Sequence, residues 1–129
     1  MKKTDVLLAI ERLKQAVARL EDALGRVRDD LDRDGAIQRF EFTVELLWKT
    51  LAIQLEYQGI TCQSPRNCIK LAFRHGLIED DELLLDMIED RNRSSHVYNE
   101  KTAEEIFTRI SKLYAKSIRQ VLERLESTL

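Results

Sequence analysis

Helix-breaking residues are scarce in this chain, and their scarcity is the strongest constraint on its fold. The sequence of 129 residues contains one proline, Pro65, and four glycines. These residue types interrupt α-helices most strongly. No segment alternates polar and apolar residues in the manner of a strand. The sequence therefore predicts long helices, and its length favours a single domain over residues 1–129 with a core of its own.

Apolar residues recur at alternating steps of four and three near the start of the chain. The series is Val6, Ile10, Leu13, Val17, Leu20, Leu24, Val27 and Leu31. This spacing predicts a helix from about residue 4 to residue 27 with one apolar stripe. A dimerising coiled coil and the inward face of a helical bundle both produce such a stripe. We favour the bundle, because packing within one chain already accounts for the pattern.

A turn is predicted at residues 32–35, where aspartates and Gly35 follow one another. The next helix then covers about residues 36–58 and ends at Gly59. One apolar face of this helix comprises Ile37, Phe40, Val44, Leu47, Leu51 and Leu55. Part of a second apolar face of the same helix comprises Phe42, Leu46, Ile53 and Tyr57. Two apolar faces predict a central helix that is covered on both sides.

Three more helices are indicated by their capping residues. Ser64 and Pro65 begin a short helix that ends near Gly76. Another helix begins near residue 80 and extends into the polar segment after Ile88. The last begins at a capping box that starts with Thr102. The predicted fold class is therefore all-α, an up-and-down four-helix bundle with an additional short helix, five helices in total.

Charge and composition limit the kinds of ligand and binding partner that the chain could have. The chain has 21 Lys and Arg against 23 Asp and Glu, so any nucleic-acid contact requires a local basic patch. No apolar run approaches the roughly 18 residues that cross a bilayer, and we expect no membrane contact. Cys62 and Cys68 do not form a CxxC pair, and we expect reduced thiols in a cytoplasmic protein. With only His75 and His96 available, we expect neither a metal site nor a cofactor.

One polar segment concentrates reactive side chains. It runs Arg91-Asn92-Arg93-Ser94-Ser95-His96-Val97-Tyr98. Arginine can hold a phosphate through two parallel hydrogen bonds, and histidine can move a proton near pH 7. The segment therefore suits binding and cleavage of a phosphodiester. The alternative is a polar helix end, at which His96 only complements the helix dipole.

Helical spacing constrains how this segment could act. Arg91 and His96 are five residues apart, which places them about 140° apart around an ideal α-helix. Either the helix distorts near Ser94 and Ser95, or a second copy of the segment completes the site. A two-fold homodimer would bring two His96 residues together and supply both a base and an acid.

A second candidate surface is basic. Arg66, Lys70 and Arg74 recur at steps of four along the short helix that begins at Pro65. This stripe could bind RNA phosphates. The alternative is an ordinary solvated face, which is the more frequent origin of such a stripe.

The segment from Arg91 to His96 resembles the hallmark of the HEPN superfamily, an Arg and a His separated by four to six residues. With Tyr98 it gives Arg-x4-His-x-Tyr, which resembles the HepT toxins that pair with MntA-type minimal nucleotidyltransferases. Residues 35–42 and 72–78 also resemble the branch described as nucleotidyltransferase substrate-binding subunits. The resemblance covers nearly the whole chain. It implies a homodimeric helical bundle and, in active members, a metal-independent ribonuclease.

The resemblance also implies roles for individual residues. His96 would act as general base or acid, and Arg91 would stabilise charge on the phosphate. Asn92 and Ser95 would support this pair, and Arg93 is left as an auxiliary RNA contact. Tyr98 matches the tyrosine to which the partner nucleotidyltransferase adds AMP.

Three functions remain open at this point. The first is a HepT-like ribonuclease toxin silenced by its nucleotidyltransferase. The second is a non-catalytic module that presents a substrate, or its own Tyr98, to the nucleotidyltransferase. The third is a purely structural dimeric bundle. The presence of Arg91, His96 and Tyr98 together favours the first.

Overall fold

The computed structural model describes residues 1–96 and 99–128, and within these ranges the chain forms helices and no strand. The elements are α1 (Lys3–Leu24), α2 (Asp30–Tyr57), α3 (Pro65–Arg74), α4 (Asp81–His96), α5 (Glu100–Arg109), the π-helical turn η1 (Ile110–Tyr114) and α6 (Ala115–Ser127). The last three follow one another without a gap and form one long helix. The predicted all-α fold is therefore confirmed for the described residues.

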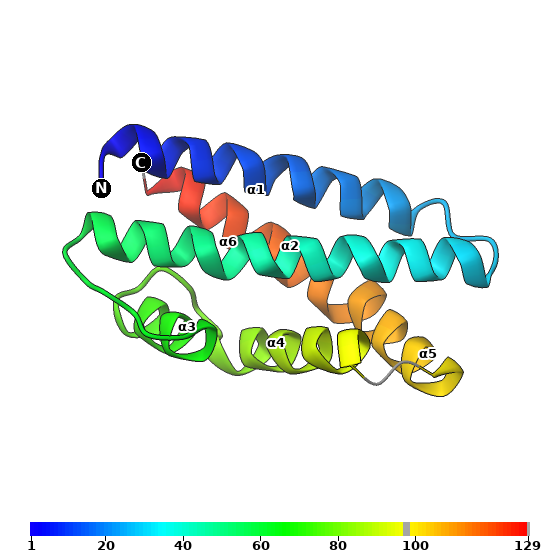
Figure 1. Ribbon diagram of the computed structural model, residues 1–129. Helices are drawn as coiled ribbons and strands as arrows, with labels where there is room; N and C mark the ends of the chain where they lie inside the picture. The colour runs from blue at the N-terminus through cyan, green and yellow to red at the C-terminus, as the bar shows by residue number, and fades with distance from the viewer. Residues whose placement is uncertain (97–98, 129) are drawn as a thin grey trace.

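The four long helices run alternately up and down (Figure 1). α1 and α2 lie side by side and antiparallel, and α4 lies along the other side of α2. The helix formed by α5, η1 and α6 returns across the bundle and packs on α1. α3 is the additional short helix, between α2 and α4. Because α2 contacts α1, α3, α4 and α5, the prediction that it is the central helix is confirmed.

The apolar stripe of α1 faces the core of this chain, as the bundle interpretation predicts. Its members from Val6 to Leu20 are buried, whereas Leu31 belongs to α2 and is 79% exposed. The predicted inner face of α2 is buried throughout. The second predicted face is only partly covered, because Phe42 and Tyr57 are 58% and 45% exposed. None of the helices described here is long and apolar enough to span a membrane.

Two predicted helix boundaries are wrong. The first turn lies at residues 25–29 rather than 32–35, and Gly35 lies inside α2. The carboxylate of Asp29 accepts a hydrogen bond from the Asp32 N–H (2.8 Å) and caps α2. This cap, with acidic residues in the first turn, offsets the cost of about 1 kcal/mol for a glycine inside a helix. Likewise Asn99, rather than Thr102, caps α5 (2.9 Å).

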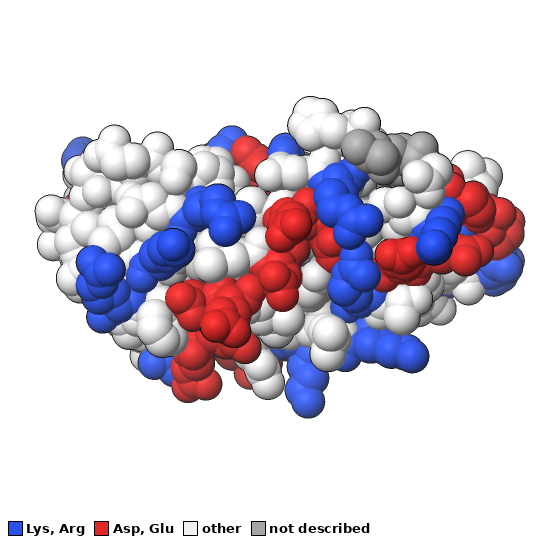
Figure 2. All heavy atoms as spheres, turned by 90° about the horizontal axis from the view of Figure 1, so that it is seen from below, with Lys and Arg blue, Asp and Glu red and all other residues white. Residues whose placement is uncertain are grey.

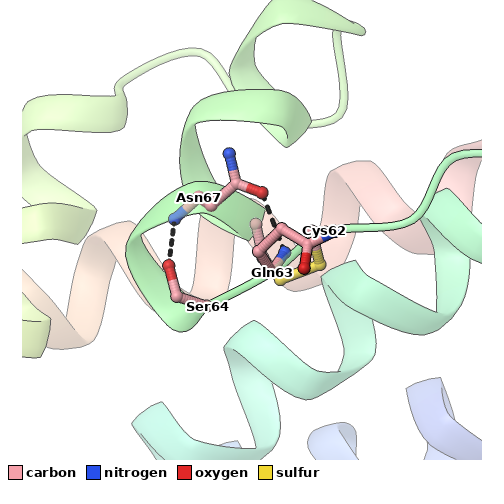
Figure 3. The surroundings of a disulfide bond; sticks show 5 residues. Cys62, Gln63, Ser64 and Asn67 are labelled. Carbon is pink, nitrogen blue, oxygen red and sulfur yellow. Dashed lines mark hydrogen bonds between the residues drawn. A yellow bond between two sulfur atoms is a disulfide. The ribbon is translucent and has the colours of Figure 1, made fainter.

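The prediction of two reduced thiols is also wrong, because Cys62 and Cys68 form a disulfide bond (Figure 3). Ser64 caps α3 by accepting a hydrogen bond from the Asn67 N–H (3.1 Å), and Asn67 Oδ1 accepts one from the Gln63 N–H (2.9 Å). These bonds turn the chain back on itself. The two Cα atoms therefore lie 5.0 Å apart, within the range that a disulfide bridges.

Reduction of this disulfide should lower the free energy of unfolding by about 2 kcal/mol, because the bond closes a short loop in the unfolded chain. The expected result is a lower urea midpoint in the presence of dithiothreitol. The matched control is the double variant Cys62→Ser/Cys68→Ser, whose midpoint should not respond to the reductant. An equal response in both proteins would contradict the prediction.

Candidate functional site

The polar segment occupies the last two turns of α4 and continues beyond its end. α4 remains an α-helix through His96, so the distortion considered near Ser94 and Ser95 does not occur. Arg91 and His96 therefore project about 140° apart around the helix axis. Within one chain, the helix alone does not turn these two side chains toward each other.

Arg91 is half-buried against α2. Its Nη2 atom lies 3.4 Å from Glu45 Oε2, and its Nη1 atom donates to Asn92 Oδ1 (3.2 Å). Its Nε atom is buried and makes no hydrogen bond within the described residues. Glu45 also receives a hydrogen bond from Trp48 Nε1 (3.2 Å) and pairs with Lys49 Nζ (3.4 Å). The guanidinium is thus held in place, but its donors are not all engaged by the described part of the chain.

The two serines of the segment contact a single carboxylate on α2. Ser94 Oγ and Ser95 Oγ each lie 2.6 Å from Glu41 Oε2, and each also lies 3.0 Å from the Arg91 carbonyl oxygen. Ser94 is buried and Ser95 is exposed. Glu41 and Glu45 are four residues apart and so share one face of α2. This face holds the end of α4 at two points.

His96 is exposed, and its imidazole makes no hydrogen bond or ion pair with the described part of the chain. It is therefore accessible to a ligand or a second chain. Tyr98, the predicted site of AMP addition, lies outside the described residues. No group of three or more His, Cys, Asp and Glu side chains within residues 1–96 and 99–128 is arranged to hold a metal ion.

A buried carboxylate precedes Arg91 directly. Asp90 is 4% exposed and accepts hydrogen bonds from Arg109 Nε (2.6 Å), Arg109 Nη2 (2.9 Å) and Tyr114 Oη (2.5 Å). Burial and the bond to Asp90 raise the pKa of the Tyr114 phenol, which stays protonated and donates. Arg93 Nη1 lies 3.5 Å from the same carboxylate. The predicted auxiliary RNA contact is therefore partly engaged within the protein.

The start of α5 is held by an ion pair with α2. Arg33 is 5% exposed, and its Nη1 and Nη2 atoms donate to the two carboxylate oxygens of Glu100 (2.7 and 3.2 Å). It also donates to Asp34 (3.1 Å). The pair with Arg33 holds the pKa of the Glu100 carboxyl below its ordinary value. The chain is thus anchored directly after residues 97–98.

This anchor should weaken in acid. The pKa of the Glu100 carboxyl is lower in the folded protein than in the unfolded chain. The ionised carboxylate therefore stabilises the fold at pH values above the unfolded-state pKa, and this stabilisation is lost as the pH falls through the folded-state pKa. We expect the wild type to be more stable than Glu100→Gln at about pH 6, with the difference shrinking toward about pH 3. Urea midpoints of both proteins across this range provide the measurement. A constant difference would contradict the prediction.

The basic stripe lies apart from the polar segment. Arg66, Lys70 and Arg74 are exposed on α3. Figure 2 shows a row of basic groups over the region of α3, and a band of acidic groups separates it from a second basic group on the same face. Direct contact of one short RNA with both groups would have to cross this acidic band. The role of the stripe in RNA binding stays a prediction.

Three residues that the sequence did not connect with the segment contact it in the structure. Glu41, Glu45 and Asp90 were not among the predicted site residues. Their positions carried a weak signal, because both glutamates lie within a helix that has apolar faces and Asp90 follows an apolar stretch. Which partner each carboxylate meets depends on helix packing, which the sequence does not display.

Comparisons with known proteins find one matching family and several similar chains. The family model described as nucleotidyltransferase substrate binding protein like matches residues 5–127. A Haemophilus influenzae protein described as probable ribonuclease HepT is 31% identical over 88 residues. That match covers 64% of this chain and 60% of the other protein, so it spans less than two thirds of that relative.

Solved structures share the fold. A Thermus thermophilus protein is 40% identical, with a TM-score of 0.80 over 88% of this chain and 98% of that one. A Haemophilus influenzae protein, described as showing the fold of a substrate binding domain of a nucleotidyltransferase, is 26% identical with a TM-score of 0.69 over 97% and 99%. A tri-AMPylated HEPN toxin from Shewanella oneidensis, in complex with MNT antitoxin, is 19% identical with a TM-score of 0.80 over 98% and 99%. This last likeness concerns the fold alone.

Proposed function

Because the chain belongs to the nucleotidyltransferase substrate binding protein like family, we propose that it is a HepT-like ribonuclease toxin of the HEPN superfamily. In this proposal a partner nucleotidyltransferase of the MntA type acts as the antitoxin. It silences the toxin by adding AMP to Tyr98. We propose that this activity takes place in the cytoplasm, where the RNA substrate would be encountered.

One observation carries the proposal: Arg91 and His96 retain the spacing of the HEPN motif, and the exposed His96 imidazole makes no polar contact with the described residues. A histidine that served only to stabilise the bundle would be expected to contact the protein. Arg91 is oriented by Glu45 (3.4 Å) and Asn92 (3.2 Å), which supports a fixed direction for its guanidinium. An oriented cation can hold a phosphate, and an accessible imidazole can transfer a proton, so the two together suit phosphodiester cleavage.

The proposed reaction is an attack of the ribose 2′-OH on the adjacent phosphate. One His96 accepts the proton from the 2′-OH as the bond from O2′ to phosphorus forms. The bond from phosphorus to O5′ then breaks, and O5′ takes a proton from a second imidazolium. Arg91 stabilises the charge that builds on the non-bridging oxygens. The products are a 2′,3′-cyclic phosphate and a 5′-hydroxyl end.

The second imidazole would come from a homodimer. Within one chain Arg91 and His96 point about 140° apart, and a single histidine cannot be base and acid at once. A two-fold axis near the end of α4 would place the exposed His96 of each chain across one RNA strand. Ser95 would then keep the end of the helix on α2 through Glu41 (2.6 Å). Arg93, together with Arg66, Lys70 and Arg74 on α3, would contribute RNA contacts.

Silencing would follow from the chemistry of the phenol. The Tyr98 oxygen attacks the α-phosphorus of ATP, the bond to the leaving pyrophosphate breaks, and the phenolic proton is released. The attached AMP adds a negative charge and a bulky base two residues from His96. Both oppose the approach of an RNA phosphate.

The non-catalytic binding module is the second candidate. It is favoured by the solved structure described as a substrate binding domain of a nucleotidyltransferase, at 26% identity. Such a module would bind the nucleotidyltransferase and leave RNA intact. It would have no use for the exposed His96.

Tyr98→Phe separates AMP addition from cleavage. The purified chain is incubated with RNA alone, and separately with ATP and an MntA-type nucleotidyltransferase before intact-mass measurement. We expect the wild type to cut RNA and to gain mass in steps of one AMP, whereas the variant cuts RNA but gains no mass. Labelling that persists on the variant would show that Tyr98 is the wrong residue. Intact RNA with wild-type protein in every condition would favour the binding module.

A further inference from the structure

We propose that Asp90 is a positioning residue for Arg91 and His96. We also propose that the π-helical turn η1 orients the side chains that donate hydrogen bonds to the Asp90 carboxylate. The inference rests on the proposed function, because it concerns the same two residues. It adds a third anchor for the end of α4, formed with Arg109 of α5 and Tyr114 of η1, beside the contacts with Glu41 and Glu45 of α2.

The first argument is the burial of the carboxylate. Asp90 is 4% exposed, and a charge in such surroundings is costly unless it is fully paired. Arg109 supplies two donors and Tyr114 a third, at 2.5–2.9 Å. The bond to Asp90 also raises the pKa of the Arg109 guanidinium.

The second argument is the helical geometry of the donors. Arg109 and Tyr114 are five residues apart, and an ideal α-helix would place them about 140° apart around its axis. Across η1 the backbone hydrogen bond spans five residues, as in the bond from the Ala115 N–H to the Ile110 carbonyl. A π-turn brings residues at this spacing onto one face, where both reach Asp90. π-turns are rare, and they occur frequently at functional sites.

The third argument is that the anchors connect into a ring. Tyr114 stacks on Phe40 of α2, with ring centroids 5.6 Å apart. The next residue of α2 is Glu41, which contacts Ser94 and Ser95. The ring therefore runs from α4 through η1 to α2 and back to α4. Without the bonds from Arg109 and Tyr114 to Asp90, the end of α4 that carries Arg91 and His96 would be held only by its contacts with α2.

The test measures both cleavage and the surroundings of His96. In Asp90→Asn we expect kcat for RNA cleavage to fall by about 100-fold, the loss expected for a misplacement on the order of 1 Å. KM should change by less than about threefold, because Arg66, Lys70 and Arg74 on α3 are untouched and only Arg93 among the proposed RNA contacts lies near Asp90 (3.5 Å). The NMR signals of the His96 imidazole should shift, while those of His75 next to α3 stay in place.

The matched control is Glu21→Gln. Glu21 accepts hydrogen bonds from Arg119 Nε (3.0 Å) and Nη2 (2.5 Å), so it forms the same kind of clamp between α1 and α6. This variant should lose stability but retain kcat and the His96 signals. If Asp90 is merely structural, the two variants will change unfolding midpoints and nothing else.

The remaining outcomes also decide the question. A folded Asp90→Asn protein with wild-type His96 signals overturns the inference. If that variant does not fold, Tyr114→Phe replaces it, since this change keeps the ring and removes only the donor. It should give a smaller loss of kcat and the same shift at His96, and the inference fails without the shift. If the wild type cuts no RNA, the proposed function fails, whereas the His96 signals still test the positioning by Asp90.

Discussion

Replacing His96 with alanine should lower the turnover of RNA cleavage by about 10²–10⁴-fold, the usual contribution of a general acid or base. The imidazole is exposed and makes no polar contact in the described part of the chain, so its loss should not disturb the fold. The measurement is the rate of cleavage of a short RNA at saturating concentration. Circular dichroism and size-exclusion chromatography establish that the variant retains its helices and its assembly state.

The other histidine of the chain provides the control. His75 is also exposed and caps the carboxyl end of α3, where it has no proposed role in cleavage. His75→Ala should keep wild-type turnover. Equal rates in wild type and His96→Ala would remove the imidazole from the mechanism. A loss in both variants would point to a general effect of histidine replacement rather than to a site at His96.

Replacing Phe40 with alanine should lower the free energy of unfolding by about 3–5 kcal/mol. The side chain is fully buried at the centre of the bundle and stacks on Tyr114, with a centroid distance of 5.6 Å. The cavity left behind would also loosen the partner of Asp90. Since small proteins are stable by only about 5–15 kcal/mol, this single change would remove a large share of the total stability. Urea denaturation followed by circular dichroism measures the effect.

Phe42 is the matched control, because it has the same side chain two residues further along α2. It is 58% exposed, so Phe42→Ala should change the free energy of unfolding by no more than about 0.5 kcal/mol. A large loss at Phe42 in the purified protein would mean that this side chain is covered in the assembled state. Comparable small losses in both variants would contradict the burial of Phe40.

The sequence alone determined the helical class, most of the core and the motif. The spacing of apolar residues and the capping residues are local properties of the sequence. The inner face of α2 and the bounds of α3 could therefore be predicted from residues that lie within a few turns of one another. Gly76 follows the end of α3 with a positive φ of 79°, as expected for a glycine after a helix. The Arg91 and His96 spacing was visible for the same reason.

Where two local signals competed, the sequence was less informative. Gly35 next to aspartates suggested a turn, but Asp29 caps α2 and the helix continues through Gly35. Packing of α2 against its neighbours stabilises the longer helix. The disulfide between Cys62 and Cys68 depended on a similar detail, the fold of the cap at Ser64, which sets the two Cα atoms 5.0 Å apart.

Only the tertiary structure decided what surrounds the motif. Glu41 lies 53 residues from Ser94 in the sequence, and Arg109 lies 19 residues from Asp90. Whether such pairs meet depends on the crossing of helices and on the π-turn at η1, which changes the direction of Tyr114. Short-range pattern dictates which side chains lie on a helix face, whereas the packing of whole helices dictates which charges those faces bring together.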